Sequence, residues 1–140
     1  MIASTEVFLD TNVLLYAAMG SVDDPAKNER AIELLTTRFG TSGQVLAEFY
    51  VNAQRKGSVP LTADEAKEWV FRLSKKAFQP VDFAVIRNGI EHARRYQMSY
   101  WDGAIIAAAE RLGARVVYSE DLNHGQTYGS VRVENPFKDL

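Results

Sequence analysis

The sequence predicts an α/β fold: a three-layer α/β/α sandwich around a central, mostly parallel sheet. Short apolar segments, typical of strands buried on both faces, alternate with longer segments whose apolar residues recur at helical spacing. Strands that alternate with helices favour parallel pairing. No linker, repeat or low-complexity segment divides the 140 residues, so we expect one domain over residues 1–140.

The expected elements of the first half follow from apolar patterns and one proline. The segment VFL predicts a strand at residues 6–9, and Pro25 suits the first position of a helix. In chain order we expect a strand at 6–9, a helix from about 11 to 18, a polar loop at 20–24, a helix at 25–38, a short strand or turn at 39–42 and a helix at 45–53.

Capping residues set the elements of the second half. Thr62 opens a capping-box signature, Asp82 and Ser99 are suitable N-caps, and Gly113 is a suitable left-handed helix terminator. We expect helices at 62–76, 83–96 and 99–113, strands at 78–81 and 114–119, and an edge strand at 131–134.

Composition excludes several classes of protein. The absence of cysteine excludes a disulfide scaffold, a cysteine zinc site and a thiol nucleophile, and it fits a reducing cytoplasm. The apolar stretches are too short to span a bilayer and the N-terminus lacks signal-peptide features, so we expect a cytoplasmic protein without a membrane segment. With a net charge of −2, an anionic substrate must be bound by local features.

Four carboxylates in apolar surroundings are the main candidates for chemistry. We call them the acidic quartet: Asp10 in VFLDTN, Glu48 in QVLAEFY, Asp102 in SYWDGA and Asp121 in VVYSED. Asp10 and Asp121 both follow buried strands, so parallel pairing would bring them to the same edge of the sheet. An ionised carboxylate near a core is costly unless it is paired or binds a cation. Because oxygen-only ligands suit Mg²⁺ or Mn²⁺, the quartet predicts a metal site.

Each acid taken alone also has a structural interpretation. Asp10 could be only the N-cap of the next helix, and Asp102, in the first turn after Ser99, could be a capping residue favoured by the helix dipole. Glu48 could lie solvated on the polar edge of its helix. The four together favour the ligand interpretation.

The four motifs, in this order, resemble the PIN domain, and most closely the VapC-type toxin ribonucleases of toxin–antitoxin pairs. The resemblance covers essentially the whole chain and implies that the acidic quartet is both catalytic and metal-binding, with Mg²⁺ or Mn²⁺ as the ion. It also implies that Asn12 and Ser119 are supporting polar neighbours that orient ligands, water or the scissile phosphate. Glu120 is the alternative register for the last acid.

The same resemblance implies partners. These are an RNA substrate, a cognate antitoxin and a second copy of the chain in a homodimer. An arginine of an inhibitor peptide could pair with Asp10, Glu48 or Asp102 in place of the metal. The candidate aromatic residues for the dimer interface are Trp69, Phe71, Tyr50 and Tyr96.

Two other functions stay open at this point. A haloacid-dehalogenase-like phosphatase also has a nucleophilic aspartate after its first strand, but it generally needs a second aspartate where this chain has Asn12. The other is a non-catalytic binding module of the PIN fold. His92 is expected on the surface of its helix, and His124 is expected to be a solvated loop residue or, less favoured, a substrate contact. Trp101 is interpreted as a core or dimer contact or, less favoured, as a stacking surface for a base. The basic pairs Arg55–Lys56, Lys75–Lys76 and Arg94–Arg95 would offer phosphate contacts only where they line the acidic pocket.

Overall fold

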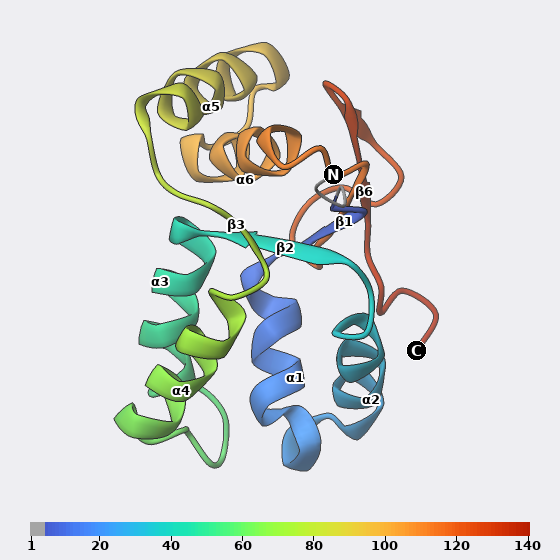
Figure 1. The fold of residues 1–140 in the computed structure, drawn as a ribbon. Helices are drawn as coiled ribbons and strands as arrows, with labels where there is room; N and C mark the ends of the chain where they lie inside the picture. The colour runs from blue at the N-terminus through green and yellow to red at the C-terminus, as the bar shows by residue number, and fades with distance from the viewer. Residues whose placement is uncertain (1–4) are drawn as a thin grey trace.

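The computed structural model describes residues 5–140 and contains a six-stranded sheet with helices on both faces. The strands are β1 (Val7–Leu9), β2 (Phe39–Ser42), β3 (Ala77–Gln79), β4 (Val116–Tyr118), β5 (Thr127–Tyr128) and β6 (Val131–Glu134). The helices are α1 (Thr11–Asp23), α2 (Pro25–Leu34), α3 (Gly43–Ala53), α4 (Ala63–Leu73), α5 (Phe83–Tyr96) and α6 (Tyr100–Arg111). Figure 1 shows α1–α4 on one face of the sheet and α5 and α6 on the other, which confirms the predicted three layers.

Strand order explains how distant residues meet at one end of the sheet. The order is β3-β2-β1-β4-β6-β5, and every pairing is parallel except that of β5 with β6. In the centre, Leu9 at the end of β1 is opposite Tyr118 at the end of β4. The segments that leave these two strands therefore begin side by side, although more than 100 residues separate them in the sequence.

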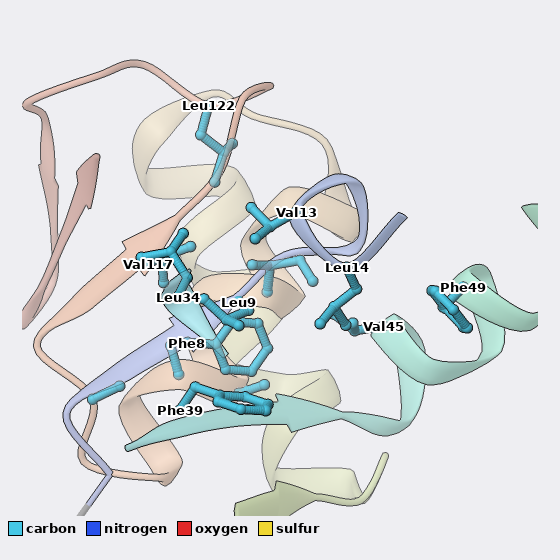
Figure 2. Packing of buried hydrophobic residues seen from close by; sticks show 14 of the residues in the cluster. Phe8, Leu9, Val13, Leu14, Leu34, Phe39, Val45, Phe49, Val117 and Leu122 are labelled. Carbon is cyan, nitrogen blue, oxygen red and sulfur yellow. The ribbon is translucent and has the colours of Figure 1, made fainter. Parts of the chain in front are cut away.

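The core lies between the centre of the sheet and the helices packed on it. Phe8 and Leu9, which point to opposite faces of the sheet, have no exposed surface, so β1 is covered on both faces. In β4, Val117 is fully buried, whereas Val116 and Tyr118 on the other face are half-buried. Figure 2 shows the side chains of Phe8, Leu9 and Val117 in one cluster with side chains from β2, α1, α2 and α3. Complete burial of each large side chain is worth roughly 1.5–3 kcal/mol, so this cluster fixes the ends of β1 and β4 firmly.

Two glycines set the close packing of α5 against α6. A Cβ atom built on Gly103 would lie 2.4 Å from the carbonyl oxygen of Gly89, so a larger residue would push the helices apart. Because Gly103 directly follows Asp102, this contact also fixes the first turn of α6. The capping predictions for Pro25, Thr62, Asp82, Ser99 and Gly113 are confirmed, the last with φ of +76°.

Several predicted boundaries are wrong. The polar segment 20–24, expected as a loop, is helical to Asp23. A Cβ atom built on Gly20 would lie 3.2 Å from the Cβ of Asn28, so this part of α1 packs closely on α2. Helix α2 ends at Leu34 and not near residue 38. Just after this end, the hydroxyls of Thr36 and Thr37 donate to the backbone carbonyls of Glu33 and Leu34. Helices α4 and α6 also end slightly before the predicted residues, at Leu73 and Arg111.

The edge of the sheet next to β6 also differs from the prediction. β6 is not an edge strand, because β5 pairs with it in antiparallel fashion and forms the edge itself. β5 has only two residues, too few to give a periodic signal. None of the helices within residues 5–140 is long and apolar enough to cross a membrane.

Candidate functional site

Asp10 leaves β1 at the carboxyl end of the sheet and begins α1. Its backbone N–H donates to the carbonyl of Tyr118 at 3.1 Å, so the residue is tied to the end of β4. Its Oδ1 accepts from the Thr11 N–H at 2.7 Å, and its Oδ2 accepts from the Ser119 hydroxyl at 2.8 Å. Asp10 is thus the N-cap of α1, as its structural interpretation required, and it is also an 8% exposed carboxylate fixed at the sheet edge.

Ser119 links Asp10 to the turn that carries Asp121. The Ser119 side chain is completely buried. While it donates to Asp10, its Oγ accepts from the backbone N–H of Asp121 at 3.2 Å and of Leu122 at 3.4 Å. The structure therefore places Ser119 between two predicted site residues, in a position to orient both.

Glu48 reaches the same region from α3. Its Oε2 accepts from the Thr11 hydroxyl at 2.9 Å and its Oε1 from the Gln44 side-chain amide at 3.0 Å. Gln44 also donates to the carbonyl of Trp101 at 3.3 Å. Glu48 is therefore a half-buried, oriented side chain and not a solvated helix acid. The sequence interpretation did not identify Thr11 and Gln44 as residues that orient Glu48. The only sequence signals were that Thr11 directly follows Asp10 and that Gln44 lies one helical turn before Glu48.

Asp102 lies in the first turn of α6, where its N–H donates to the N-cap hydroxyl of Ser99 at 3.1 Å. Its carboxylate is half-buried. Partial burial raises the pKa of Asp102, and the charges of Asp121 and Glu48 raise it further. Asp102 is therefore close enough to both acids to interact with them electrostatically.

The pKa of Asp10 is also raised, chiefly because this carboxyl is buried. Burial raises the pKa of Asp10 from 3.8 to about 6, and the charges of Asp121 and Glu48 add to the rise. The hydrogen bonds from Ser119 and Thr11 act in the opposite direction but do not cancel it. None of the ion pairs within residues 5–140 includes a member of the acidic quartet. Among the described residues, Asp10 and Asp102 thus have a pKa raised by burial and by nearby acids of the quartet, without an ion pair to a cationic side chain.

The donor set fits a hard divalent cation. All four quartet members offer carboxylate oxygens, and the buried Oδ1 of Asn12 has no hydrogen-bond partner. In the part of the chain that the structure describes, no three acidic or histidine side chains form a ready-made metal cage. Mg²⁺ keeps several of its waters and so does not require such a cage. The residues that would hold the ion are Asp10, Glu48, Asp102 and Asp121.

Comparison with known proteins identifies the family. The PIN domain family matches residues 7–129, which is most of the chain. The chain belongs to the PIN domain family. No curated protein sequence matches this PIN domain.

Solved structures share the fold of this PIN domain. The toxin VapC20 of Mycobacterium tuberculosis, described as cleaving the sarcin–ricin loop, is 21% identical with a TM-score of 0.66, over 91% of this chain and 99% of that chain. A toxin–antitoxin complex of Klebsiella pneumoniae is 15% identical with a TM-score of 0.67, over 94% and 98% of the two chains. DNA-bound VapBC of Salmonella typhimurium is 21% identical with a TM-score of 0.62, over 92% and 96%. At these identities the likeness concerns the fold alone.

Glu120, the alternative register for the last acid, points away from the quartet of this PIN domain. Its carboxylate pairs with Lys27 and accepts from the Tyr16 hydroxyl at 2.9 Å. Lys27 also donates to that hydroxyl at 3.2 Å. The turn is exposed at Asp121 and Asn123, as expected, but the Glu120 side chain itself is only 26% exposed because of these contacts. Asp121, and not Glu120, is the acid whose charge acts on Asp10 and Asp102.

The two histidines differ from each other. His124 is exposed, as expected, and its Nδ1 accepts from the Asn135 N–H at 3.0 Å. His92, expected on the surface of its helix, has a side chain that is only 15% exposed, because it pairs with Glu110 and stacks on Tyr96. Trp101 is 63% exposed, so it is not a core residue.

Proposed function

We propose that this PIN domain is a metal-dependent endoribonuclease and the toxin component of a type II toxin–antitoxin pair. The observation that carries the proposal is the acidic quartet. It gathers oxygen ligands at one edge of the sheet and leaves their charge without a cationic side chain. A cation that bridges the quartet and a phosphodiester would balance both charges, so an acidic protein could still bind RNA.

The chemistry would be direct hydrolysis of an RNA phosphodiester. When bound, Mg²⁺ or Mn²⁺ would make a water more acidic and offset negative charge on the phosphate. The chain supplies orientation: Ser119 and the Thr11 N–H hold the two oxygens of Asp10, while the Thr11 hydroxyl and Gln44 hold those of Glu48. Carboxylates fixed in this way need little reorganisation. Asn12, which lines a cleft together with Asp121, has a buried side-chain oxygen without a hydrogen-bond partner.

The alternatives receive less support. A haloacid-dehalogenase-like phosphatase is disfavoured, because the chain has the PIN fold and Asn12 replaces the second aspartate. A non-catalytic PIN module would have no need to retain four acids near one another at a cost in stability. Binding of Mn²⁺ measured by calorimetry separates this last alternative from an enzyme.

The proposed partners are a cytoplasmic RNA, a cognate antitoxin and a second copy of the chain. Two of the four aromatic residues suggested for the dimer are engaged within the chain. Trp69 packs on Phe49, and the Tyr96 hydroxyl accepts from the Gly129 N–H at 2.8 Å. Phe71 and Tyr50 remain 56% and 39% exposed and are the better candidates. If an antitoxin arginine pairs with the quartet, rising Mn²⁺ should weaken the inhibition.

The direct test is cleavage of RNA by the purified chain. We expect single-stranded or looped RNA to be cut in Mg²⁺ or Mn²⁺ and left intact in EDTA, and we expect overexpression without the antitoxin to arrest growth. Asp10→Asn, purified in the same way, controls for a contaminating nuclease. Cleavage that continues in EDTA would contradict the metal mechanism, whereas metal-dependent cleavage without growth arrest would contradict only the toxin role.

A further inference from the structure

A cleft of about 260 Å³ extends from Asp121, one member of the quartet, along α1. Asn12 and Asp121 line it near the start of α1, and Lys56 and Gly57 line it near the end of that helix. Met19, which lies next to Gly57, is seven residues after Asn12, so the cleft follows α1 for roughly 10 Å at the helical rise. It connects Asp121, one of the four candidate metal ligands, to a lysine that the sequence could not place.

The loop that carries Lys56 is attached to α1. The N–H of Ser58 donates to Oδ2 of Asp23 at 2.9 Å, and the Ser58 hydroxyl donates to the same carboxylate. Gly57 has φ of +80°, and a Cβ atom there would lie 3.1 Å from both Asp23 and Met19. The close approach and the positive φ favour glycine here. The loop is thereby held against the end of α1, with Lys56 at the cleft.

Four carboxylates line this cleft, those of Asp23, Asp24, Glu120 and Asp121, and within residues 5–140 none of them forms an ion pair with Lys56. Glu120 pairs with Lys27, Asp23 accepts from Ser58, and Asp24 caps α2 by accepting from the Lys27 N–H at 3.2 Å. None of the ion pairs within residues 5–140 includes Lys56, and its side chain is exposed. A lysine ammonium in this position is a mobile point charge with three donors, which suits a phosphate oxygen.

We propose that this cleft seats the RNA strand on one side of the cleaved phosphodiester and that Lys56 binds a phosphate further along that strand. The inference rests on the proposed nuclease function and adds the direction in which the substrate leaves the quartet. Among the basic pairs, Lys56 shares a cleft with a quartet member, whereas its neighbour Arg55 does not line this cleft. Lys56 would therefore act as a substrate-positioning residue.

The test compares Lys56→Ala with Arg55→Ala, since both remove one exposed positive charge from the same loop. Binding of a short single-stranded RNA is measured by fluorescence anisotropy at several salt concentrations, in the Asp10→Asn background so that the RNA stays intact. We expect Lys56→Ala to weaken binding about tenfold and to lower the salt slope by about 0.7, the value for one phosphate contact on a single strand. Arg55→Ala should change neither the RNA affinity nor the salt slope, and Lys56→Arg should keep most of the wild-type RNA affinity. Mn²⁺ affinity, measured by calorimetry with Asp10 intact, should be the same in wild type and Lys56→Ala.

The outcomes separate this inference from the nuclease proposal. If RNA affinity in Lys56→Ala equals that in Arg55→Ala while the wild type cleaves RNA, the inference is wrong and the nuclease stands. If the wild type does not cleave but Lys56→Ala alone weakens RNA binding, the cleft stands as a nucleic-acid site and the nuclease proposal fails. Reduced Mn²⁺ affinity in Lys56→Ala would show that the lysine acts through the quartet and would overturn its role as a strand contact.

Discussion

Glu120 and the acidic quartet lie on either side of the turn after β4, and they differ in how their negative charge is balanced. Glu120 points into a network in which Lys27 and the Tyr16 hydroxyl bind it, and the Lys27 ammonium also lies 4.9 Å from the centre of the Tyr16 ring. Asp121, the next residue, belongs to the acidic quartet. Within residues 5–140 no quartet member forms an ion pair, and the carboxylates of Asp10 and Glu48 accept from hydroxyl, amide and backbone groups. Of two adjacent residues, Glu120 is thus paired with a lysine, whereas Asp121 forms no ion pair within the described residues.

The difference indicates separate roles for the two regions. A carboxylate paired with a half-buried lysine holds two elements together, and removing either partner leaves a charge with no counterpart. A group of like charges with oriented oxygens and no cation costs stability in the free protein. Such an arrangement is expected where an external cation completes the site. The following experiments test this contrast.

The largest expected effect is the loss of RNA cleavage when the quartet is neutralised. Asp10→Asn and Asp102→Asn should each lower the rate of cleavage about 100-fold or more, because each removes a charged ligand of the proposed ion. Glu120→Gln, on the other side of the turn, should stay within a few-fold of the wild type. If Asp10→Asn unfolded the protein yet retained its specific activity, Asp10 would be a helix cap alone.

The sequence predicted much of this site, because strand ends and caps are local signals. Asp10 follows a continuous apolar segment and Asp102 lies three residues after Ser99, so both could be placed from neighbouring residues. The orientation of Glu48 depends on Thr11, 37 residues away, and that of Glu120 on Lys27, 93 residues away. Those pairings depend on tertiary structure, and no local pattern encodes them. The polar composition of segment 20–24 likewise predicted a loop where α1 continues to Asp23 and packs closely on α2.

The second effect is a pH dependence of stability that belongs to Asp10. Its folded pKa of about 6 lies above its ordinary value of 3.8, so the neutral acid favours the folded state below about pH 4, and this contribution is lost as the pH rises through 6. The full loss is about 3 kcal/mol. In urea unfolding with EDTA present, the free energy of unfolding of Asp10→Asn should therefore rise relative to that of the wild type between about pH 4 and 7. A constant difference over that range would contradict a buried carboxylate in the native state.

The third effect concerns the pair of Glu120 with Lys27. Lys27→Met should lower the free energy of unfolding by about 2 kcal/mol, less than for a fully buried pair because both side chains are 26% exposed. The double variant Lys27→Met with Glu120→Gln should recover part of that loss, since it removes the unpaired carboxylate. A strictly additive double variant would show that the pair is not coupled.

The smallest effect is stabilisation by metal at moderate concentration. Mn²⁺ at ten times its dissociation constant should raise the free energy of unfolding of the wild type by about 1.4 kcal/mol, through preferential binding to the folded state. Protons compete for Asp10, so the increase at a fixed Mn²⁺ concentration should be smaller at pH 5 than at pH 7.5. Lys27→Met should respond to Mn²⁺ like the wild type, because its network does not include the quartet, whereas Asp10→Asn should respond weakly. Equal stabilisation of Asp10→Asn and wild type by Mn²⁺ would place the ion elsewhere and remove the proposed distinction between the two regions.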